Sequence, residues 1–242
     1  MTTQPVLQLQ NVTKRFGGLV AVRDLSFTMA EGEILGLIGP NGAGKSTTFN
    51  VISGFYKPSD GELSFRGENI TGLKPSVVCK RGLVRTFQHD SLLREMTVYD
   101  NIVVGAYRAV PVKGQRAEHV RQTARLLGIE AHLDDVAGKL SHGVQRLVSI
   151  AIALAARPRL LCLDEPLTGL NQTEVGTALD AFRRIRTDHN CGILLVEHNM
   201  KAVMSICDRV VVLDHGEFLT SGTPEEVKRN PAVISAYLGT RQ

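Results

Sequence analysis

Short apolar runs alternate with helical stretches through most of the chain. Ile34–Ile38, residues 160–163 and residues 193–196 are continuous apolar runs of strand length. Such runs are typical of parallel strands that are buried on both faces. Helical periodicity follows them at residues 46–53 and at residues 172–186. The pattern predicts an α/β fold with a central parallel sheet.

Other strand patterns surround these runs. Residues 6–10 alternate between apolar and polar positions, and residues 20–22, 25–27 and 62–65 are further short strand candidates. Residues 84–88 predict one more strand. Residues 209–213 and 217–220 predict a hairpin around His215-Gly216. Thr223-Pro-Glu-Glu226 forms a capping box with proline at the first helical position, so we expect helices at the carboxyl end of the chain.

The stretch from residue 91 to about residue 139 has a helical pattern throughout. Thr97 and Asp100 resemble a helix-capping pair, and Val120, Ala124 and Leu127 form an apolar stripe that Gly128 ends. Pro111 and Gly114 are expected to break this stretch into two helices. Together they predict a helical insertion of about fifty residues, which we treat as a subdomain.

A long helix that is apolar nearly all round follows this insertion. Ser141 is its natural N-cap, and Arg157-Pro158 is expected to end it. We therefore predict one domain over residues 1–242. Residues 1–90 and 157–242 form its catalytic core, and residues 91–156 form the helical subdomain, which includes this helix.

Composition and charge indicate which partners and which cellular compartment to expect. The 242 residues carry a formal net charge of +4 with a pI near 9.0, an excess too small to argue for nucleic acid as a partner. Three of the four cysteines lie in or beside apolar runs and none forms a Cys-x-x-Cys pair, so we expect a reduced cytoplasmic setting. No secretory signal is apparent, and the longest apolar run, residues 150–156, is too short to span a bilayer. If the protein works at a membrane, another chain must supply the spans.

The sequence Gly39-Pro-Asn-Gly-Ala-Gly-Lys45-Ser46 fits the phosphate-binding loop pattern, and it stands between a predicted strand and a predicted helix. Glycine at positions 42 and 44 lets the backbone turn tightly, so that successive N–H groups point inward as an anion-binding nest. The amino end of the following helix reinforces the nest. Lys45 adds a positive charge for the β- and γ-phosphates. The Ser46 hydroxyl suits Mg²⁺, which prefers oxygen ligands.

Polar residues follow the other parallel strands. Asp164 and Glu165 end one strand, His198 follows the next, and Gln88 ends a fourth. Ligands bind beyond the carboxyl ends of strands in open α/β sheets, so we expect these side chains to converge on the phosphate loop. Asp164 is placed to hold Mg²⁺ or its waters. Glu165 can act as the general base towards an attacking water, and His198 can hydrogen-bond the γ-phosphate or that water. Gln88 can complete the metal shell.

Ser141-His-Gly143 is a second candidate anion site, at the amino end of the long buried helix. One nucleotide is already served by the phosphate loop. Two anion sites per chain suggest a head-to-tail pair, in which each nucleotide lies between the loop of one chain and this helix end of the other. An ordinary N-cap serine explains the same residues equally well from the sequence.

Taken together, the phosphate loop, Gln88, residues 140–145, residues 160–165 and His198 resemble the nucleotide-binding subunit of an ABC transporter over essentially the whole chain. The resemblance implies a P-loop NTPase fold: a RecA-like parallel-sheet core, an N-terminal antiparallel β subdomain and a helical insertion. It implies ATP and Mg²⁺ as cofactors and an ATP-sandwich dimer on the cytoplasmic face of the inner membrane. The implied partners are permease subunits, a second ATP-binding subunit and, indirectly, a periplasmic substrate-binding protein.

By the same resemblance each motif residue has a role. Glu165 is the catalytic base and His198 the switch histidine. Ser46, Gln88 and Asp164 hold the metal, and the residues from Gln88 onward contact the permease. The implied nucleotide-binding residues are Phe16, which stacks on adenine, together with Gly39, Pro40, Asn41, Gly42, Ala43, Gly44, Lys45, Ser46, Thr47, Gln88, Asp164 and, for the partner's nucleotide, Ser141 and Gly143.

Several strings are similar to the subunit of branched-chain amino acid importers, namely Arg15-Phe-Gly-Gly18, Arg85-Thr-Phe-Gln-His89, Arg94-Glu-Met-Thr97, Gly169-Leu-Asn171, Glu197-His-Asn-Met200 and Tyr237-Leu-Gly239. The corresponding subunits of urea or short-amide importers and of lipopolysaccharide exporters look much like those of branched-chain amino acid importers. Urea, short amides and lipopolysaccharide therefore remain alternative cargoes. The family signature reads Leu-Ser-Gly-Gly-Gln, whereas this chain has His142 and Val144 at its third and fifth positions. With Val144 the chain lacks the side-chain amide of the signature glutamine, which could hydrogen-bond across the dimer. We expect the Gln145 side chain to substitute for it in part.

Other protein classes use the same loop. A soluble ABC-type ATPase that acts on DNA or the ribosome usually carries two cassettes or a coiled-coil or zinc insertion, and this chain has one cassette, no heptad run and no cysteine pairing. A GTPase would need an Asn-Lys-x-Asp guanine reader, which is missing from the sequence. A small-molecule kinase needs no buried serine-capped helix of this kind.

Overall fold

The structure is a computed structural model that describes residues 4–86 and 92–238. Its central sheet has six strands within those residues, in the order β10-β9-β3-β8-β7-β6. The strands β6 (Leu83–Arg85), β7 (Leu160–Asp164), β8 (Gly192–Val196), β3 (Ile34–Ile38) and β9 (Arg209–Asp214) run parallel, and β10 (Glu217–Gly222) is the antiparallel edge. The sequence pattern thus predicts the parallel core correctly.

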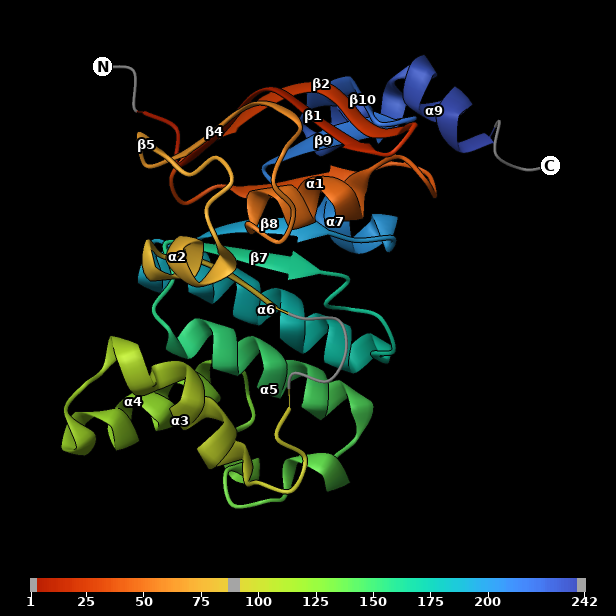
Figure 1. Ribbon diagram of the computed structural model, residues 1–242. Helices are drawn as coiled ribbons and strands as arrows, with labels where there is room; N and C mark the ends of the chain where they lie inside the picture. The colour runs from red at the N-terminus through yellow and green to blue at the C-terminus, as the bar shows by residue number, and fades with distance from the viewer. Residues whose placement is uncertain (1–3, 87–91, 239–242) are drawn as a thin grey trace.

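A second sheet lies at the top of Figure 1, beside the β9–β10 end of the first sheet. It is antiparallel, in the order β2-β1-β4-β5, and consists of β1 (Leu7–Phe16), β2 (Leu19–Met29), β4 (Asp60–Phe65) and β5 (Glu68–Asn69). The expectation of separate strands at residues 20–22 and 25–27 is wrong, because β2 is one strand. The pairing of β2 with β1 shifts register between Val12 and Lys14, and Asp24 adopts a left-handed φ of 47°, which interrupts the apolar alternation.

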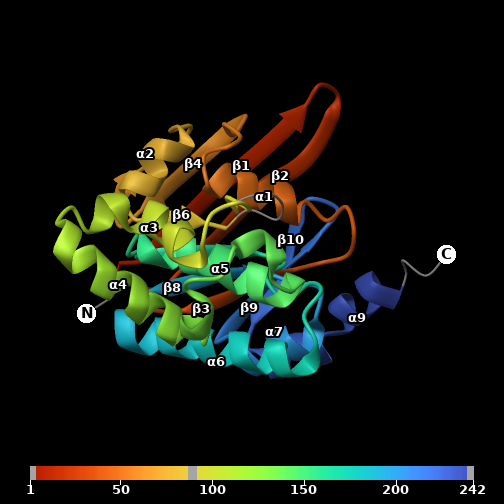
Figure 2. The same ribbon diagram turned by 90° about the horizontal axis from the view of Figure 1, so that it is seen from below.

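Two hydrophobic cores lie on opposite faces of the parallel strands. Leu161 and Leu163 of β7 point into one core, and Leu160 and Cys162 point into the other, as expected of a strand with period two. The second core also contains Phe49 of α1 (Lys45–Ile52), and α1 lies on the opposite side of the sheet from α6 (Gln172–His189) and α7 (Met200–Ile206) (Figure 2). Parallel strands buried on both faces give the phosphate loop a rigid support.

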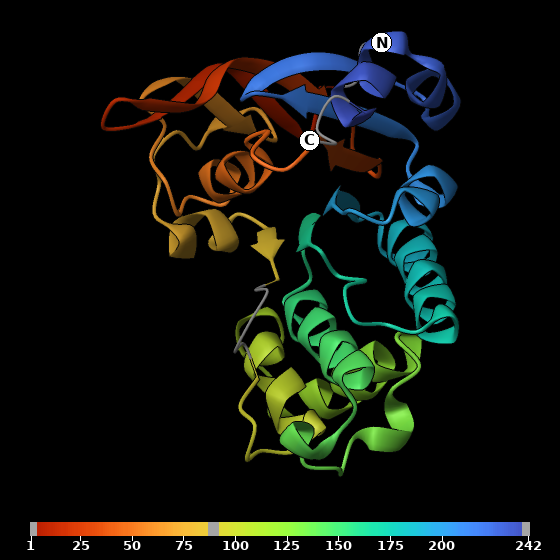
Figure 3. The same cartoon turned by 90° about the vertical axis from the view of Figure 1, so that its right-hand side faces the viewer.

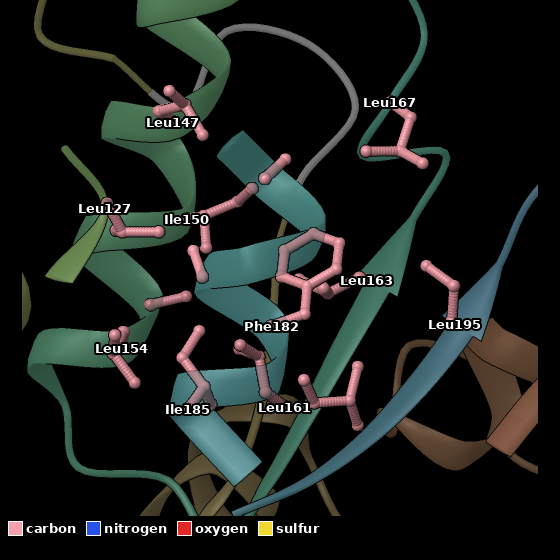
Figure 4. Close-up of a cluster of buried hydrophobic side chains, with 14 of the residues drawn as sticks. Leu127, Leu147, Ile150, Leu154, Leu161, Leu163, Leu167, Phe182, Ile185 and Leu195 are labelled. Atoms are coloured by element: carbon pink, nitrogen blue, oxygen red, sulfur yellow. The ribbon is translucent and has the colours of Figure 1, made fainter. Parts of the chain in front are cut away.

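The first core continues from the parallel sheet into the helical insertion. Phe182 and Ile185 of α6 pack with Leu161 and Leu163 on one side and with α5 (His142–Ala155) on the other (Figure 4). The helices α3 (Val98–Ala109) and α4 (Lys113–Leu126) join the same core through residues that include Ile102, Ala106, Val120 and Ala124. The insertion is therefore continuous with the first core, and α5 is the helix that connects it to α6 and the sheet.

The capping predictions in the insertion are confirmed. Thr97 accepts a hydrogen bond from the Asp100 amide, and the stripe that ends at Leu127 is buried. Pro111 lies between the two helices, but Gly114 is inside the first turn of α4, so the expectation that it breaks the stretch is wrong. Short 3₁₀ turns at Glu130–His132 and Ala137–Lys139 lead into α5.

The remaining helices are short and lie at the edges. α2 (Pro75–Lys80) precedes β6, and α8 (Pro224–Arg229) and α9 (Pro231–Leu238) follow β10. Thr223 caps α8 with the expected capping box. Within residues 4–86 and 92–238, none of the helices is both long and apolar enough to cross a bilayer.

Candidate active site

The phosphate-binding loop joins β3 to α1 and forms one wall of a cavity of about 480 Å³. Residues 41–47 line this cavity together with Leu19, Val20 and Ala21 of β2, Glu165, His198 and His215. Gly44 has a left-handed φ of 89°, and a Cβ there would lie 2.6 Å from the Ala21 carbonyl oxygen. Only glycine fits between β2 and the start of α1, so the loop keeps its backbone N–H groups close to the cavity.

Lys45 is the buried cation of this site. Its Nζ donates hydrogen bonds to the carbonyl oxygens of Gly39 at 2.7 Å and Pro40 at 2.8 Å. Burial lowers the pKa of Lys45, and the nearby carboxylates of Glu165 and Asp164 oppose that shift. The ammonium group is thus held by the loop's own carbonyls and shares the cavity region with two acids, an arrangement that suits a phosphate chain and its metal ion.

Asp164 ends β7 with a buried carboxylate. Its Oδ1 has no hydrogen-bond partner among the described residues, and burial raises the pKa of this carboxyl. An unpaired buried carboxylate oxygen is costly unless a cation or an ordered water completes it. Ser46 is exposed and lines the cavity. These oxygens fit a hard divalent cation such as Mg²⁺.

Glu165 and His198 meet at the edge of the cavity. His198 Nε2 lies 2.7 Å from Glu165 Oε1, although the two residues come from different strand ends. Glu165 has a left-handed φ of 47°, and its amide donates to the Val196 carbonyl at 2.8 Å. The convergence predicted from the strand ends is therefore present for Lys45, Asp164, Glu165 and His198.

The amino end of α5 is the second candidate anion site. Ser141 is exposed, and its Oγ accepts a hydrogen bond from the Val144 amide at 3.3 Å. This helix end lies on the same side of the molecule as the carboxyl end of β7, on the right in Figure 1 and facing the viewer in Figure 3. A Cβ on Gly143 would meet the end of the flexible Glu174 side chain, so the Glu174 carboxylate lies directly against this helix end. Ser141 is therefore open to a neighbouring molecule.

Some predicted site residues are placed elsewhere. Gln88 lies outside the described residues. Phe16 does not line the cavity; its ring is 41% exposed and meets Tyr56 edge-on with ring centroids 5.2 Å apart. Gln145 Nε2 donates to the Leu140 carbonyl at 2.8 Å within the same chain, so its substitution for the missing side-chain amide across a dimer stays a prediction. Val144 packs against the first core.

Three further residues at the site were not predicted. Arg146 donates to backbone carbonyls beside Glu165, and the buried carboxylate of Glu197 accepts from the amides of Leu167 and His198. Glu174 packs against Gly143. In the sequence, Arg146 lies three residues after Gly143 and Glu197 directly precedes His198, and this closeness to predicted site residues could have identified them. Glu174 is recognisable only as the acidic N3 residue of α6.

Comparison with known proteins agrees with this geometry. Residues 22–168 match the ABC transporter family, and residues 219–242 match a family described as branched-chain amino acid ATP-binding cassette transporter. The chain is 41% identical to the high-affinity branched-chain amino acid transport ATP-binding protein LivG of Salmonella typhimurium, over 98% of this chain and 99% of that protein. It is 40% identical to BraF of Pseudomonas aeruginosa, a protein of the same description, with the same coverage.

More distant relatives show the same family. The lipopolysaccharide export system ATP-binding protein LptB of Acidithiobacillus ferridurans is 36% identical over 97% of each chain. A crystal structure of the ADP conformation of MJ1267, an ATP-binding cassette of an ABC transporter, superimposes with a TM-score of 0.88 at 29% identity, over 98% of this chain and 100% of that one. With these matches added to the cavity and its phosphate loop, the chain belongs to the ABC transporter family, as an ATP-binding and ATP-hydrolysing cassette.

Proposed function

We propose that this chain is the ATPase subunit that energises uptake of branched-chain or related hydrophobic amino acids through separate permease subunits. The observation that carries the catalytic part is the meeting of Glu165 and His198 at 2.7 Å on the wall of the phosphate-loop cavity. The cargo rests on the likeness to LivG and BraF and on the match of residues 219–242. The likeness to LptB supports lipopolysaccharide export as a second candidate.

We assign the residues of the cavity as follows. The backbone amides of residues 41–47 and the Lys45 ammonium bind the β- and γ-phosphates. Ser46 and Asp164 hold Mg²⁺, which supplies charge neutralisation of the phosphates. Glu165 takes the proton of the attacking water, and His198 holds the Glu165 carboxylate in place through its Nε2. Phe16 as a platform for adenine and Gln88 as a metal ligand remain predictions.

We propose that a second cassette completes the site. Ser141 and Gly143 of one subunit then face the γ-phosphate held by the loop of the other. The exposure of Ser141 supports this arrangement, as does the position of the amino end of α5 on the same side of the molecule as the carboxyl end of β7. A helix N-cap with a free face is a suitable anion contact once a partner brings the phosphate to it.

We propose a groove on this chain as the docking site of the permease. A cavity of about 1060 Å³ is lined by residues of α2, β6, α3 and α5, and its apolar lining residues include Leu83, Val104 and Ile152. Its described lining contains no Asp or Glu, and its basic residues include Lys80, Arg108, Arg157 and Arg159. We propose that a permease loop carrying acidic residues docks here and holds the chain at the cytoplasmic face of the membrane.

Replacing Glu165 with Gln tests the catalytic assignment. The variant should bind ATP as the wild type does and lose hydrolysis by about 100-fold or more, because the amide cannot accept the proton. Nucleotide binding and phosphate release are measured on the same preparation. Hydrolysis at the wild-type rate would remove Glu165 from the proposed role.

The cargo needs a separate experiment. A strain that lacks this chain should lose uptake of radiolabelled leucine, isoleucine and valine, and the plasmid-borne wild type should restore it. The Glu165→Gln variant in the same plasmid is the matched control, because it keeps the protein but removes turnover. Normal leucine uptake combined with a defect in the cell envelope would favour the export alternative.

A further inference from the structure

Arg146 connects the amino-terminal part of α5 to the loop that carries the proposed base. Its Nη2 donates to the carbonyl oxygens of Asp164 at 2.6 Å and Glu165 at 2.5 Å, and its Nε lies 3.4 Å from the Pro166 carbonyl oxygen. Three consecutive carbonyls thus face one guanidinium group. The planar fork of arginine suits such a contact, whereas a lysine ammonium is a single point of charge.

The backbone that Arg146 holds is strained. Glu165 is not a glycine, yet its φ is 47°. A non-glycine residue in the left-handed region costs about 1 kcal/mol and persists where its surroundings fix it. The Glu165 amide is fixed by the Val196 carbonyl, and the Glu165 carbonyl is fixed by Arg146. This conformation directs the Glu165 carboxylate to His198.

A buried carboxylate complements the arginine. Glu197 is 3% exposed and accepts hydrogen bonds from the amides of Leu167 at 2.7 Å and His198 at 3.0 Å. Arg146 therefore binds the carbonyls of the loop after β7, and Glu197 binds an amide of that loop together with an amide of the loop after β8. Burial lowers the pKa of Arg146, and the carboxylates of Asp164, Glu197 and Glu165 oppose the shift.

From this geometry we propose that Arg146 is a positioning residue for hydrolysis, which links the position of α5 to the backbone conformation of Glu165. The same helix carries Ser141 and Gly143 at its amino end, five and three residues before Arg146. Contact of a neighbour's nucleotide with that end would then act on the base of the subunit to which α5 belongs. The proposal rests on the proposed role of Glu165 and adds a residue and a route that this role does not require.

The test compares Arg146→Lys with Arg146→Met in the full chain. Both variants should lower kcat for ATP hydrolysis on the order of 10- to 100-fold, since a small misplacement of the base has an effect of this size. The KM for ATP and the Kd for MgADP should stay within about twofold of the wild type, because the phosphate loop and Lys45 are untouched. Thermal unfolding of each variant is followed alongside.

Arg209→Lys is the matched control. Arg209 also donates to a backbone carbonyl, that of Thr28, and pairs with Glu33, but it lies at the opposite end of the parallel strands. This control should keep the wild-type kcat. Wild-type kcat in Arg146→Lys would overturn the proposal, as would equal losses of kcat and MgADP affinity, which indicate general damage. Should Arg146→Met fail to fold, Arg146→Lys decides. The failure of Glu165→Gln to block hydrolysis would instead refute the assigned base.

Discussion

The chain has two helix ends of the kind that bind anions, and their surroundings differ. The start of α1 lines a partly open cavity, and the carboxylates of Glu165 and Asp164 lie close enough to Lys45 to act on its pKa. The start of α5 is exposed at Ser141, and the charged group packed against it is the Glu174 carboxylate. The first end has a cation within hydrogen-bonding range of its loop, and the second has an acid against its backbone.

The difference indicates how the work is divided between the two ends. A phosphate can be held at α1 by one chain alone, because charge and amides are both supplied there. A free anion gains little at α5, since the field of the helix end is small at an exposed position and a carboxylate lies close by. A nucleotide already neutralised by Lys45 and a metal ion on another subunit is the better ligand for that end.

The largest expected effect is the loss of MgADP affinity when Lys45, at the α1 end, is substituted, compared with a substitution at the α5 end. Lys45→Ala should lower the affinity of the single chain for MgADP on the order of 100-fold, because the buried charge next to the phosphates is lost. Ser141→Ala should leave that affinity unchanged and lower hydrolysis instead. Calorimetric binding and steady-state ATPase assays measure the two quantities. If Ser141→Ala weakens MgADP binding by a single chain, the two ends are not divided in this way.

The sequence predicts the surroundings of the α1 end better than those of the α5 end. The phosphate loop, the strand ends and the Ser141 cap follow from local patterns, because glycine turns, apolar runs and capping residues act over a few positions. The contacts of Glu174 with Gly143 and of Arg146 with Glu165 join residues that are 31 and 19 positions apart, so no local pattern contains them. The single strand β2 was missed for a related reason, since its bulges break the alternation.

The next effect tests the close packing at the second end. Gly143→Ala should push the flexible Glu174 carboxylate away from the amino end of α5, with a change in stability below about 1 kcal/mol because alanine is the better helix former. Hydrolysis should fall as well, whereas MgADP binding by the folded variant should stay normal. Gly42→Ala is the comparison at the α1 end. A Cβ at position 42 would meet no atom within 4 Å, but φ there is 82°, in the left-handed region that disfavours alanine. Its damage should come from backbone strain and appear in MgADP affinity.

A smaller effect concerns the missing signature amide. Val144→Gln should tighten nucleotide-driven dimerisation by about 1 kcal/mol, close to fivefold, if the restored amide reaches across the interface. Since Val144 packs against the first core, part of that gain is offset by lost apolar contact. Sedimentation with ATP in the Glu165→Gln background measures the dimer, and Val144→Ala is the control for lost packing. A dimer as weak as that of Val144→Ala would mean that the site does not depend on this amide.

The smallest expected effect concerns how much the buried Asp164 carboxylate, near the α1 end, lowers the stability of the nucleotide-free chain. Burial raises the pKa of Asp164 above its ordinary value of 3.8, so this carboxyl stabilises the fold less as the pH rises from that value through the raised pKa. Asp164→Asn removes the charge, and it should raise the stability at neutral pH by about 0.5 kcal/mol, or about 1–2 °C in Tm. The difference between variant and wild type should disappear below the ordinary pKa. A lower Tm in the variant at neutral pH would show that the charged form is already stabilised without a metal ion, and the acids beside the α1 end would then not need a bound cation to complete them.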